Sequence, residues 1–295
     1  MNLSLSRSFP IAKAALAAAV IACTFALACS LTGCASGGTD SSSVDADNTS
    51  ASTDGKTLRV AMELAYPPFE TKDDAGNPEG LAVDFIRDFG AAYGYDVQIE
   101  NTAWDGLIPS LQSDKADLVI SSMTITDERK QSVDFSDAYA MAQLAILANA
   151  NSGVASIDDL NQPGKKVAVK TGSTGDVYAT KNLTNAEIVR LADESACVTE
   201  VVQGKADGFL YDQLTIYRNH QANPDTTEAV FIPFQDAEEW GIAVKKGNTE
   251  LLDQLNAFIA QSKTDGEFDR LTEKYLADEK KAFDQYGFKW FFDFE

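Results

Sequence analysis

The sequence predicts an α/β protein that is built from two similar units. Short apolar runs, which are typical of buried strands, alternate with segments in which apolar residues recur at helical spacing. This alternation extends from residue 58 to about residue 130 and occurs again between residues 167 and 210. A last strand and two amphipathic helices follow residue 240. Because strands that alternate with helices favour a layer of parallel strands, we expect two α/β layers.

The first unit is expected to contain three strands and three helices. Leu81, Phe85 and Phe89 share one face of a helix, which makes that helix the best defined of these elements. The predicted strands are 58–62, 97–99 and 117–120. The predicted helices are 81–93, 107–112 and one that begins at 127 after its cap, Thr126.

The second unit repeats this pattern. Its predicted strands are 167–169, 187–189 and 207–210. One predicted helix begins near residue 174, and a second covers 196–203. A strand at 241–244 and helices at 251–262 and 268–275 then return to the first unit. In open α/β sheets, ligands bind outside the carboxyl ends of the strands, so we expect the binding site between the two units.

The first 33 residues have the features of an export signal. Arg7 and Lys13 give a positive start, and residues 14–29 are almost wholly apolar. This apolar run is shorter than the ~20 residues that a membrane-spanning helix needs. The tetrad Leu31-Thr-Gly-Cys34 resembles a lipobox, which implies that Cys34 is acylated and becomes the mature N-terminus. We therefore expect a signal peptide at 1–33 and a lipidated flexible tether at 34–56, which is rich in small and polar residues.

Charge and cysteine content exclude several classes of protein. The chain has 45 acidic and 24 basic side chains, and this acidic balance argues against a nucleic-acid partner. Cys23 and Cys29 leave with the signal and Cys34 is expected to carry lipid, so Cys197 remains alone and no internal disulfide is expected. The single histidine, His220, has no second histidine or cysteine beside it. We therefore expect neither a metal site nor a cofactor.

Four ordered motifs follow the predicted strands of the first unit. They are Glu63-Leu-Ala-Tyr-Pro-Pro-Phe69, Trp104-Asp-Gly-Leu-Ile-Pro-Ser-Leu111, Ser121-Ser-Met-Thr-Ile-Thr-Asp-Glu-Arg129 and Asp134-Phe-Ser-Asp137. Together they resemble the family 3 extracellular solute-binding proteins, which are the polar amino-acid binders of ABC importers. The resemblance covers about residues 57–276. It implies a type II periplasmic-binding-protein-like fold, in which two lobes close on a ligand in the cleft between them.

The same resemblance implies where the lobes divide. Lobe 1 is expected to comprise residues 57–140 and 238–276, and lobe 2 residues 141–237. Residues 277–295 lie beyond the resemblance and form a C-terminal tail, which we expect to pack along lobe 1 and to which we assign no function.

The resemblance further implies a clamp for the two charged groups of an amino acid. Arg129 offers a planar guanidinium fork that suits the α-carboxylate, and Asp212, at a strand end, suits the α-ammonium. Backbone N–H groups at the start of the second-unit helix can bind the same carboxylate from the other side. The residues that are expected to complete the clamp are Ser122, Thr124, Ser173 and Thr174.

Five other residues are implied in contacts with the ligand side chain. Tyr66, Trp104 and Phe69 match aromatic walls of the pocket, although an aromatic residue beside a Pro-Pro turn can equally belong to the core. Glu63 and Lys170 match positions that face the distal group of the ligand. Two alternatives remain for this last pair, because both residues can contact the ligand or they can pair with each other across the cleft.

These observations predict an extracytoplasmic substrate-binding protein of an ABC transporter rather than an enzyme. We expect it to bind a free polar amino acid, with glutamine favoured and cystine or a basic amino acid next. It is expected to be a monomer that serves an ABC permease from a lipid anchor at the outer face of the cytoplasmic membrane. A cyclohexadienyl dehydratase-like secreted enzyme on the same fold and a ligand-sensing module are the alternatives.

Overall fold

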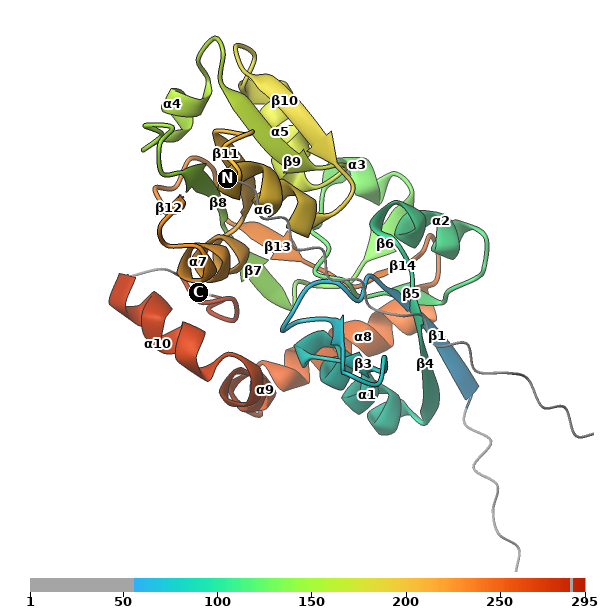
Figure 1. The fold of residues 1–295 in the computed structure, drawn as a ribbon. Helices are drawn as coiled ribbons and strands as arrows, with labels where there is room; N and C mark the ends of the chain where they lie inside the picture. The colour runs from blue at the N-terminus through green and yellow to red at the C-terminus, as the bar shows by residue number, and fades with distance from the viewer. Residues whose placement is uncertain (1–55, 287–288, 295) are drawn as a thin grey trace, which may run out of the picture. The chain divides into compact units, whose positions relative to one another are not determined.

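The computed structural model describes residues 56–286 and 289–294 (Figure 1). The predicted signal peptide, Cys34 and nearly all of the predicted tether lie outside these residues. Lys56, which was expected to end the tether, is the first residue of strand β1. None of the helices in the described part of the chain is long and apolar enough to cross a membrane.

Lobe 1 is built on a five-stranded sheet with the order β4-β1-β5-β14-β6. Its strands are β1 (Lys56–Met62), β4 (Tyr95–Asn101), β5 (Leu118–Val119), β6 (Val133–Phe135) and β14 (Ala243–Lys245). β1 pairs in parallel with β4 and β5, whereas β14 pairs antiparallel with β5 and β6. A strand from late in the chain therefore lies between two strands from the first half.

Both faces of this sheet are apolar, and different helices cover them. Val60 and Met62 belong to the core beneath three helices on one face, whereas Ala61 and Val119 pack against α2 on the other. These helices are α1 (Leu81–Tyr93), α8 (Thr249–Ser262) and α9 (Glu267–Tyr275) on the first face and α2 (Leu107–Gln112) on the second. The shorter elements of this lobe are β2 (Thr71–Lys72), β3 (Pro78–Glu79), the 3-10 helix η1 (Trp104–Gly106) and α3 (Asp127–Lys130).

Lobe 2 contains a second five-stranded sheet, with the order β10-β9-β11-β8-β12. Its strands are β8 (Leu144–Asn149), β9 (Lys166–Lys170), β10 (Glu187–Leu191), β11 (Gly208–Asp212) and β12 (Thr227–Val230). Its helices are α4 (Ile157–Leu160), α5 (Thr174–Asn182), α6 (Glu194–Val202) and α7 (Gln213–Ala222). The predicted β-α-β-α-β run is present with parallel β9, β10 and β11, while β8 pairs antiparallel with β11 and β12. Both sheets are therefore mixed, since β8 and β14 run antiparallel to the strands on either side of them.

Two short strands join the sheets. The chain passes from lobe 1 to lobe 2 through β7 (Ala140–Ala142) and returns through β13 (Glu238–Trp240). The two strands pair antiparallel with each other, with Glu238 opposite Ala142, and we call them the crossing strands. This arrangement is the predicted two-lobed type II fold; the residue at which each lobe ends stays a prediction.

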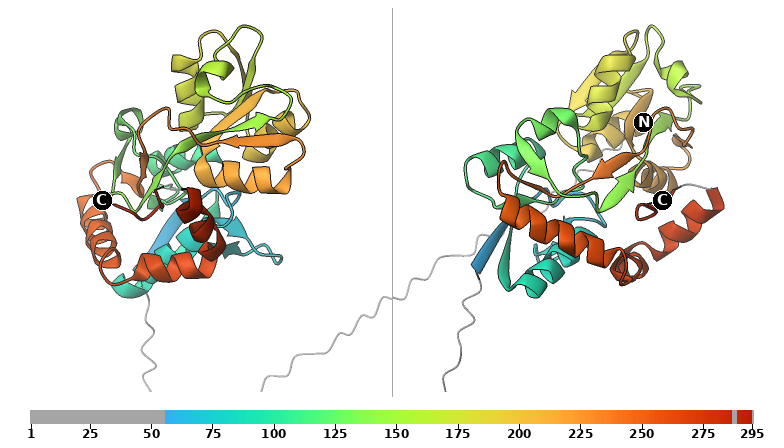
Figure 2. Two further views of the ribbon diagram at one scale, coloured as in Figure 1. Left: turned by 90° about the vertical axis from the view of Figure 1, so that its left-hand side faces the viewer. Right: turned by 180° about the vertical axis from the view of Figure 1, so that it is seen from behind.

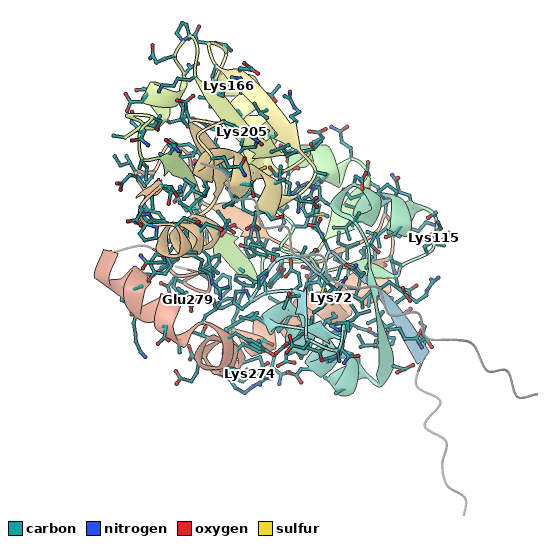
Figure 3. The ribbon with its side chains drawn as sticks, viewed as in Figure 1. Lys72, Lys115, Lys166, Lys205, Lys274 and Glu279 are labelled. Carbon is teal, nitrogen blue, oxygen red and sulfur yellow. The ribbon has the colours of Figure 1, made fainter. Side chains whose placement is uncertain are left out.

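The C-terminal tail forms part of the core. It begins with α10 (Ala277–Tyr286), and Phe283, Trp290 and Phe291 are buried in the apolar cluster of lobe 1. The carbonyl of Phe291 accepts a hydrogen bond of 2.7 Å from the backbone N–H of Met141 in β7. Glu279, which is labelled in Figure 3, pairs with Arg218 of α7 at 3.3 Å. The tail thus follows α8 and α9 along lobe 1, as expected, and in addition reaches lobe 2 (Figure 2).

Candidate functional site

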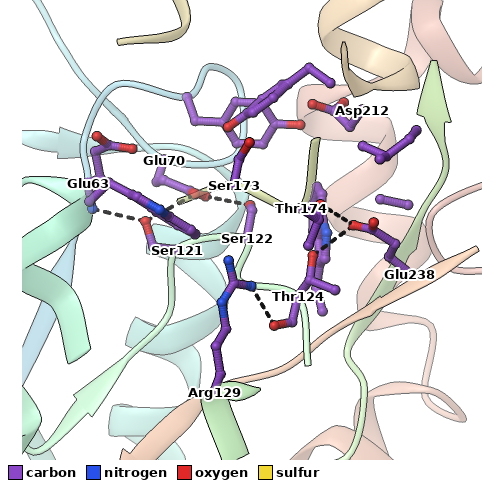
Figure 4. A pocket seen from close by; sticks show the side chains of 16 residues that line it. Glu63, Glu70, Ser121, Ser122, Thr124, Arg129, Ser173, Thr174, Asp212 and Glu238 are labelled. Carbon is purple, nitrogen blue, oxygen red and sulfur yellow. Dashed lines mark hydrogen bonds between the residues drawn. The ribbon is translucent and has the colours of Figure 1, made fainter. Parts of the chain in front are cut away.

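A cavity lies where the two lobes and the crossing strands meet. It holds about 490 Å³ of atom-free space, part of which is open to solvent (Figure 4). It is lined by Glu63, Tyr66, Glu70, Trp104, Ser121, Ser122, Thr124, Arg129, Ala142, Leu144, Ser173, Thr174, Tyr211, Asp212, Glu238 and Trp240. Nearly all of the residues that the sequence predicts for the ligand site are in this lining; Phe69 and Lys170 are the two exceptions.

Arg129 reaches the cavity from the first helical turn after a strand end. Thr126 caps this turn, because its hydroxyl accepts a hydrogen bond of 3.2 Å from the Arg129 N–H. The guanidinium donates to the carbonyl of Thr124 at 2.6 Å and to the carbonyl of Gly172 in lobe 2 at 3.2 Å. Two of its five N–H donors are satisfied in this way. The remaining donors can bind an anion in the cavity, although the positive charge of Arg129 also acts on the nearby carboxylate of Glu238.

Asp212 faces the cavity from lobe 2. It ends β11 and caps α7, where its Oδ1 accepts hydrogen bonds from the backbone N–H groups of Leu214 at 2.9 Å and Thr215 at 3.1 Å. Its Oδ2 is buried and makes no hydrogen bond of ordinary geometry among the described residues, and the same holds for the Tyr66 hydroxyl, which nevertheless lies close enough to Asp212 to lower the pKa of that carboxyl. Burial raises the pKa of the Asp212 carboxyl above its usual value. A buried carboxylate oxygen without a partner is costly, and a cation in the cavity would remove that cost.

Glu63 and Lys170 form an ion pair across the cleft. The Lys170 side chain is 5% exposed and that of Glu63 is 14% exposed, so the pair is largely shielded from water. The Lys170 ammonium also lies 5.1 Å from the centre of the Trp104 ring, and the Arg129 guanidinium lies 5.2 Å from the same ring centre. Of the two alternatives for this pair, the structure shows mutual pairing, with Glu63 still in the cavity lining and Lys170 outside it.

Glu70 is a site residue that the sequence did not indicate. It follows Phe69 directly and is 1% exposed. Its carboxylate accepts from the Ser122 hydroxyl at 3.1 Å and, at 3.4 Å, from the hydroxyl of Ser121, which itself accepts from the Glu63 N–H. Burial raises the pKa of the Glu70 carboxyl well above its usual value. Its position holds the two serines at the cavity wall.

Glu238 is the second carboxylate that sequence reasoning missed. It lies on crossing strand β13, and its Oε2 accepts from the hydroxyl of Thr124 at 3.0 Å and from that of Thr174 at 2.7 Å. Its Oε1 accepts from the Gln235 amide at 2.7 Å. Burial raises the pKa of the Glu238 carboxyl above its usual value. Ser173, beside Thr174, lines the cavity and caps α5 through a hydrogen bond from Asp176 N–H.

The aromatic wall differs from the expectation at one residue. Tyr66 and Trp104 line the cavity, and Tyr211 and Trp240 add two rings that the sequence did not indicate. Phe69 does not line it. Phe69 is fully buried behind the wall, with its ring 5.5 Å from that of Tyr66 and 5.1 Å from that of Trp240. It therefore supports two wall residues from the core.

The electrostatic pattern of the cavity suits a small zwitterion. A guanidinium with spare donors approaches from lobe 1, an unpartnered carboxylate oxygen from lobe 2, and aromatic rings form the walls. Within the described part of the chain, no group of three His, Cys, Asp or Glu side chains is placed to hold a metal ion. The fold and the cavity together define a two-lobed binding protein for a small charged solute.

Comparison with known proteins identifies the family. The chain belongs to the bacterial extracellular solute-binding proteins, family 3, whose model matches residues 58–278. It is 35% identical to the "Probable histidine-binding protein" of Neisseria gonorrhoeae over 86% of this chain and 94% of that protein. It is 33% identical to the L-cystine-binding protein TcyJ of Escherichia coli K12 over 75% of this chain and 82% of that protein.

Solved structures show the same fold. An ancestral arginine-binding protein bound to arginine is 37% identical, with a TM-score of 0.69, over 75% of this chain and 98% of that one. A second structure of an ancestral arginine-binding protein, with the same scores, contains glutamine. The ancestral amino-acid-binding protein AncCDT-1, described as a precursor of cyclohexadienyl dehydratase, is 38% identical, with a TM-score of 0.68, over 74% of this chain and 94% of that one. Amino-acid binding is thus the property that these relatives share.

Proposed function

We propose that this protein binds a free polar amino acid in the cavity between its lobes and delivers it to the permease of an ABC importer. The observation that carries the proposal is that Arg129 and the unpartnered Oδ2 of Asp212 line one cavity from opposite lobes. An α-carboxylate at Arg129 forms charge-assisted hydrogen bonds, and an α-ammonium at Asp212 supplies the missing partner. A ligand with both groups also draws the lobes together.

We further propose a neutral polar side chain for the preferred ligand. Because Glu63 and Lys170 neutralise each other, the end of the cavity beside them favours a group that both donates and accepts hydrogen bonds. A carboxamide does both, so glutamine is ranked first, cystine second, and arginine or lysine third. Ancestral arginine-binding proteins solved with arginine and with glutamine support both side chains as candidates.

A thermal-shift screen against all amino acids tests the proposal. We expect the refolded domain, freed of copurified ligand, to gain the most stability from glutamine, because binding to the native state alone raises the melting temperature. Leucine should give no shift, since its apolar side chain would cover the Glu63–Lys170 ion pair without offering it a hydrogen bond. Stabilisation by leucine alone would contradict the polar pocket, and the absence of a shift with every amino acid would contradict amino-acid binding.

One solved relative gives the enzyme alternative its support, since AncCDT-1 is described as a dehydratase precursor. A buried carboxyl of raised pKa, such as that of Glu70, is the kind of group that acts as a general acid. The binding function predicts that glutamine is recovered unchanged after prolonged incubation. Conversion of prephenate or arogenate by the wild-type protein, lost in Glu70→Gln, would establish the enzyme instead.

We also propose that Cys34 anchors the mature protein to the membrane through lipid. The proposal rests on the Leu31-Thr-Gly-Cys34 tetrad and the apolar run before it. Cys34→Ser should release the protein from the membrane fraction, because buried acyl methylenes supply the attachment. Cys197→Ser is the matched control, since Cys197 is a buried cysteine of the folded domain. Membrane association of the Cys34→Ser variant would contradict a lipid anchor.

A further inference from the structure

Glu238 already occupies hydrogen-bond donors at the place where the proposed ligand must bind. One of its oxygens accepts hydroxyl hydrogens from both lobes, from Thr124 of lobe 1 and from Thr174 of lobe 2 (Figure 4). Thr174 is the first residue of α5, whose N-terminal N–H groups were expected to bind the ligand carboxylate. Thr124 is the residue whose carbonyl binds Arg129. A carboxylate of the chain itself therefore lies within the predicted carboxylate cradle.

Little positive charge near Glu238 remains to stabilise a second carboxylate. The positive charge of Arg129 acts on Glu238 to lower its pKa, and the third hydrogen-bond partner of the Glu238 carboxylate is the neutral amide of Gln235. Lys170, a cation just outside the cavity lining, is paired with Glu63. A ligand α-carboxylate at Arg129 would thus share one guanidinium with Glu238. When two carboxylates share such a site, one of them tends to take a proton.

The other carboxyl groups of the cavity do not share a cation with the ligand carboxylate as Glu238 does. Asp212 faces the expected α-ammonium, which favours its charged form. Glu63 keeps its own counterion. Glu70 is held by Ser121 and Ser122, on the wall beside Glu63 rather than in the Thr124–Thr174 cradle. Glu238 is therefore the carboxyl on which the charge of the bound ligand acts most directly.

We propose that Glu238 takes up a proton from solvent when the amino acid binds, so that the protein binds its ligand together with a proton. The proposal rests on the proposed function. The new O–H can donate to the ligand carboxylate, while Gln235 continues to donate to the other oxygen of Glu238. The hydroxyls of Thr124 and Thr174 can rotate toward the ligand carboxylate, since a hydroxyl hydrogen is free to turn. Like-charge repulsion is replaced by a hydrogen bond.

Proton uptake by Glu238 determines whether ligand affinity rises or falls with pH. Burial raises the pKa of Glu238 in the ligand-free protein, and a neighbouring carboxylate raises it further in the complex. Between these two values the complex holds more protons than the free protein, so affinity rises as the pH falls. For uptake of one whole proton the change is about tenfold per pH unit. Below the pKa of Glu238 in the ligand-free protein, Glu238 is protonated both with and without ligand, so affinity no longer rises as the pH falls.

Calorimetry of glutamine binding in buffers of different ionisation enthalpy measures the proton uptake directly. We expect net uptake in the wild-type protein at pH values between the pKa of Glu238 in the ligand-free protein and its higher pKa in the complex. Glu238→Gln should bind glutamine without uptake and lose the matching pH dependence of Kd, since its amide oxygen can still accept from both threonines. Glu238→Asp should retain uptake. Glu239→Gln is the control, because Glu239 is exposed and adjacent on the same strand.

Each outcome separates this inference from the proposed function. Glutamine binding without proton uptake by the wild-type protein would overturn the role of Glu238 and leave amino-acid binding intact. Uptake that persists in Glu238→Gln would assign the proton to another carboxyl and also overturn it. If no amino acid binds to the folded wild-type protein, both proposals fail. Thermal unfolding of Glu238→Gln confirms that each comparison is made between folded proteins.

Discussion

Arg129→Ala is expected to weaken glutamine binding by about a hundredfold or more while the domain stays folded. The variant leaves the ligand α-carboxylate in the cavity without its cation, and truncating one partner of such a pair costs about 2–5 kcal/mol. It also removes the hydrogen bond to the carbonyl of Gly172, which joins the lobes beside the ligand. Titration calorimetry gives Kd for both proteins.

Two further variants define what Arg129 contributes. Arg129→Lys keeps the positive charge but not the planar fork, so its Kd should lie between those of the wild type and Arg129→Ala. Arg87→Ala is the matched control, because Arg87 is an exposed residue of α1 outside the cavity lining. An affinity of Arg129→Ala within threefold of the wild type would rule out Arg129 as the carboxylate site.

Lys170→Met is expected to destabilise the ligand-free protein and to change its ligand preference. It leaves the shielded carboxylate of Glu63 without a counterion, and removing one partner of a buried ion pair costs about 3–5 kcal/mol. Arginine or lysine should then restore stability more than glutamine does, because a cationic side chain can take the place of the missing ammonium. Chemical denaturation with and without each amino acid measures both effects.

Two controls belong to this experiment. The double variant Glu63→Gln with Lys170→Met removes both charges, so it should recover much of the stability and show no preference for cations. Lys166→Met removes an exposed lysine at the other end of β9. Lys166 is labelled in Figure 3, and its Nζ lies 3.7 Å from Oε2 of Glu187. Its effect should stay below about 1 kcal/mol. An unaltered ligand ranking in Lys170→Met would show that the ion pair does not set selectivity.

Elements with their own local signals could be predicted from the sequence. The helix expected at 81–93 is present with these bounds and ends before Gly94, which takes the left-handed conformation at φ 73°. The cap of Thr126 on the helix that begins at 127 is likewise present. The apolar strand β8 was missed because all of its side chains are buried, so it shows no alternation of apolar and polar residues. The helix α7 was missed because it buries polar Gln213 and Thr215.

In the candidate site, too, residues with a local sequence signal could be predicted, whereas residues that depend on distant partners could not. Residues within the motifs, such as Arg129 and Trp104, were placed at the cavity by their order along the chain. The roles of Glu70 and Glu238 could not be predicted, since their partners Ser122 and Thr124 lie 52 and 114 residues away. Whether Phe69 points into the cavity or the core depends on the rings of Trp240 and Phe291, which come from distant parts of the chain.

The position of β14 between β5 and β6 limits the order in which a growing chain can assemble its two lobes. Residues 144–230 supply every strand of the lobe 2 sheet, so that sheet is complete in composition once this stretch has been synthesised. The lobe 1 sheet lacks its fourth strand until residues 243–245 are available, and Phe69 lacks its neighbour Phe291 for longer still. Apolar surface of β5 and β6 therefore stays uncovered while a hundred or so residues are added, on the order of ten seconds at cellular rates of synthesis. A nascent chain of this protein needs protection at its N-terminal lobe, although that lobe is made first.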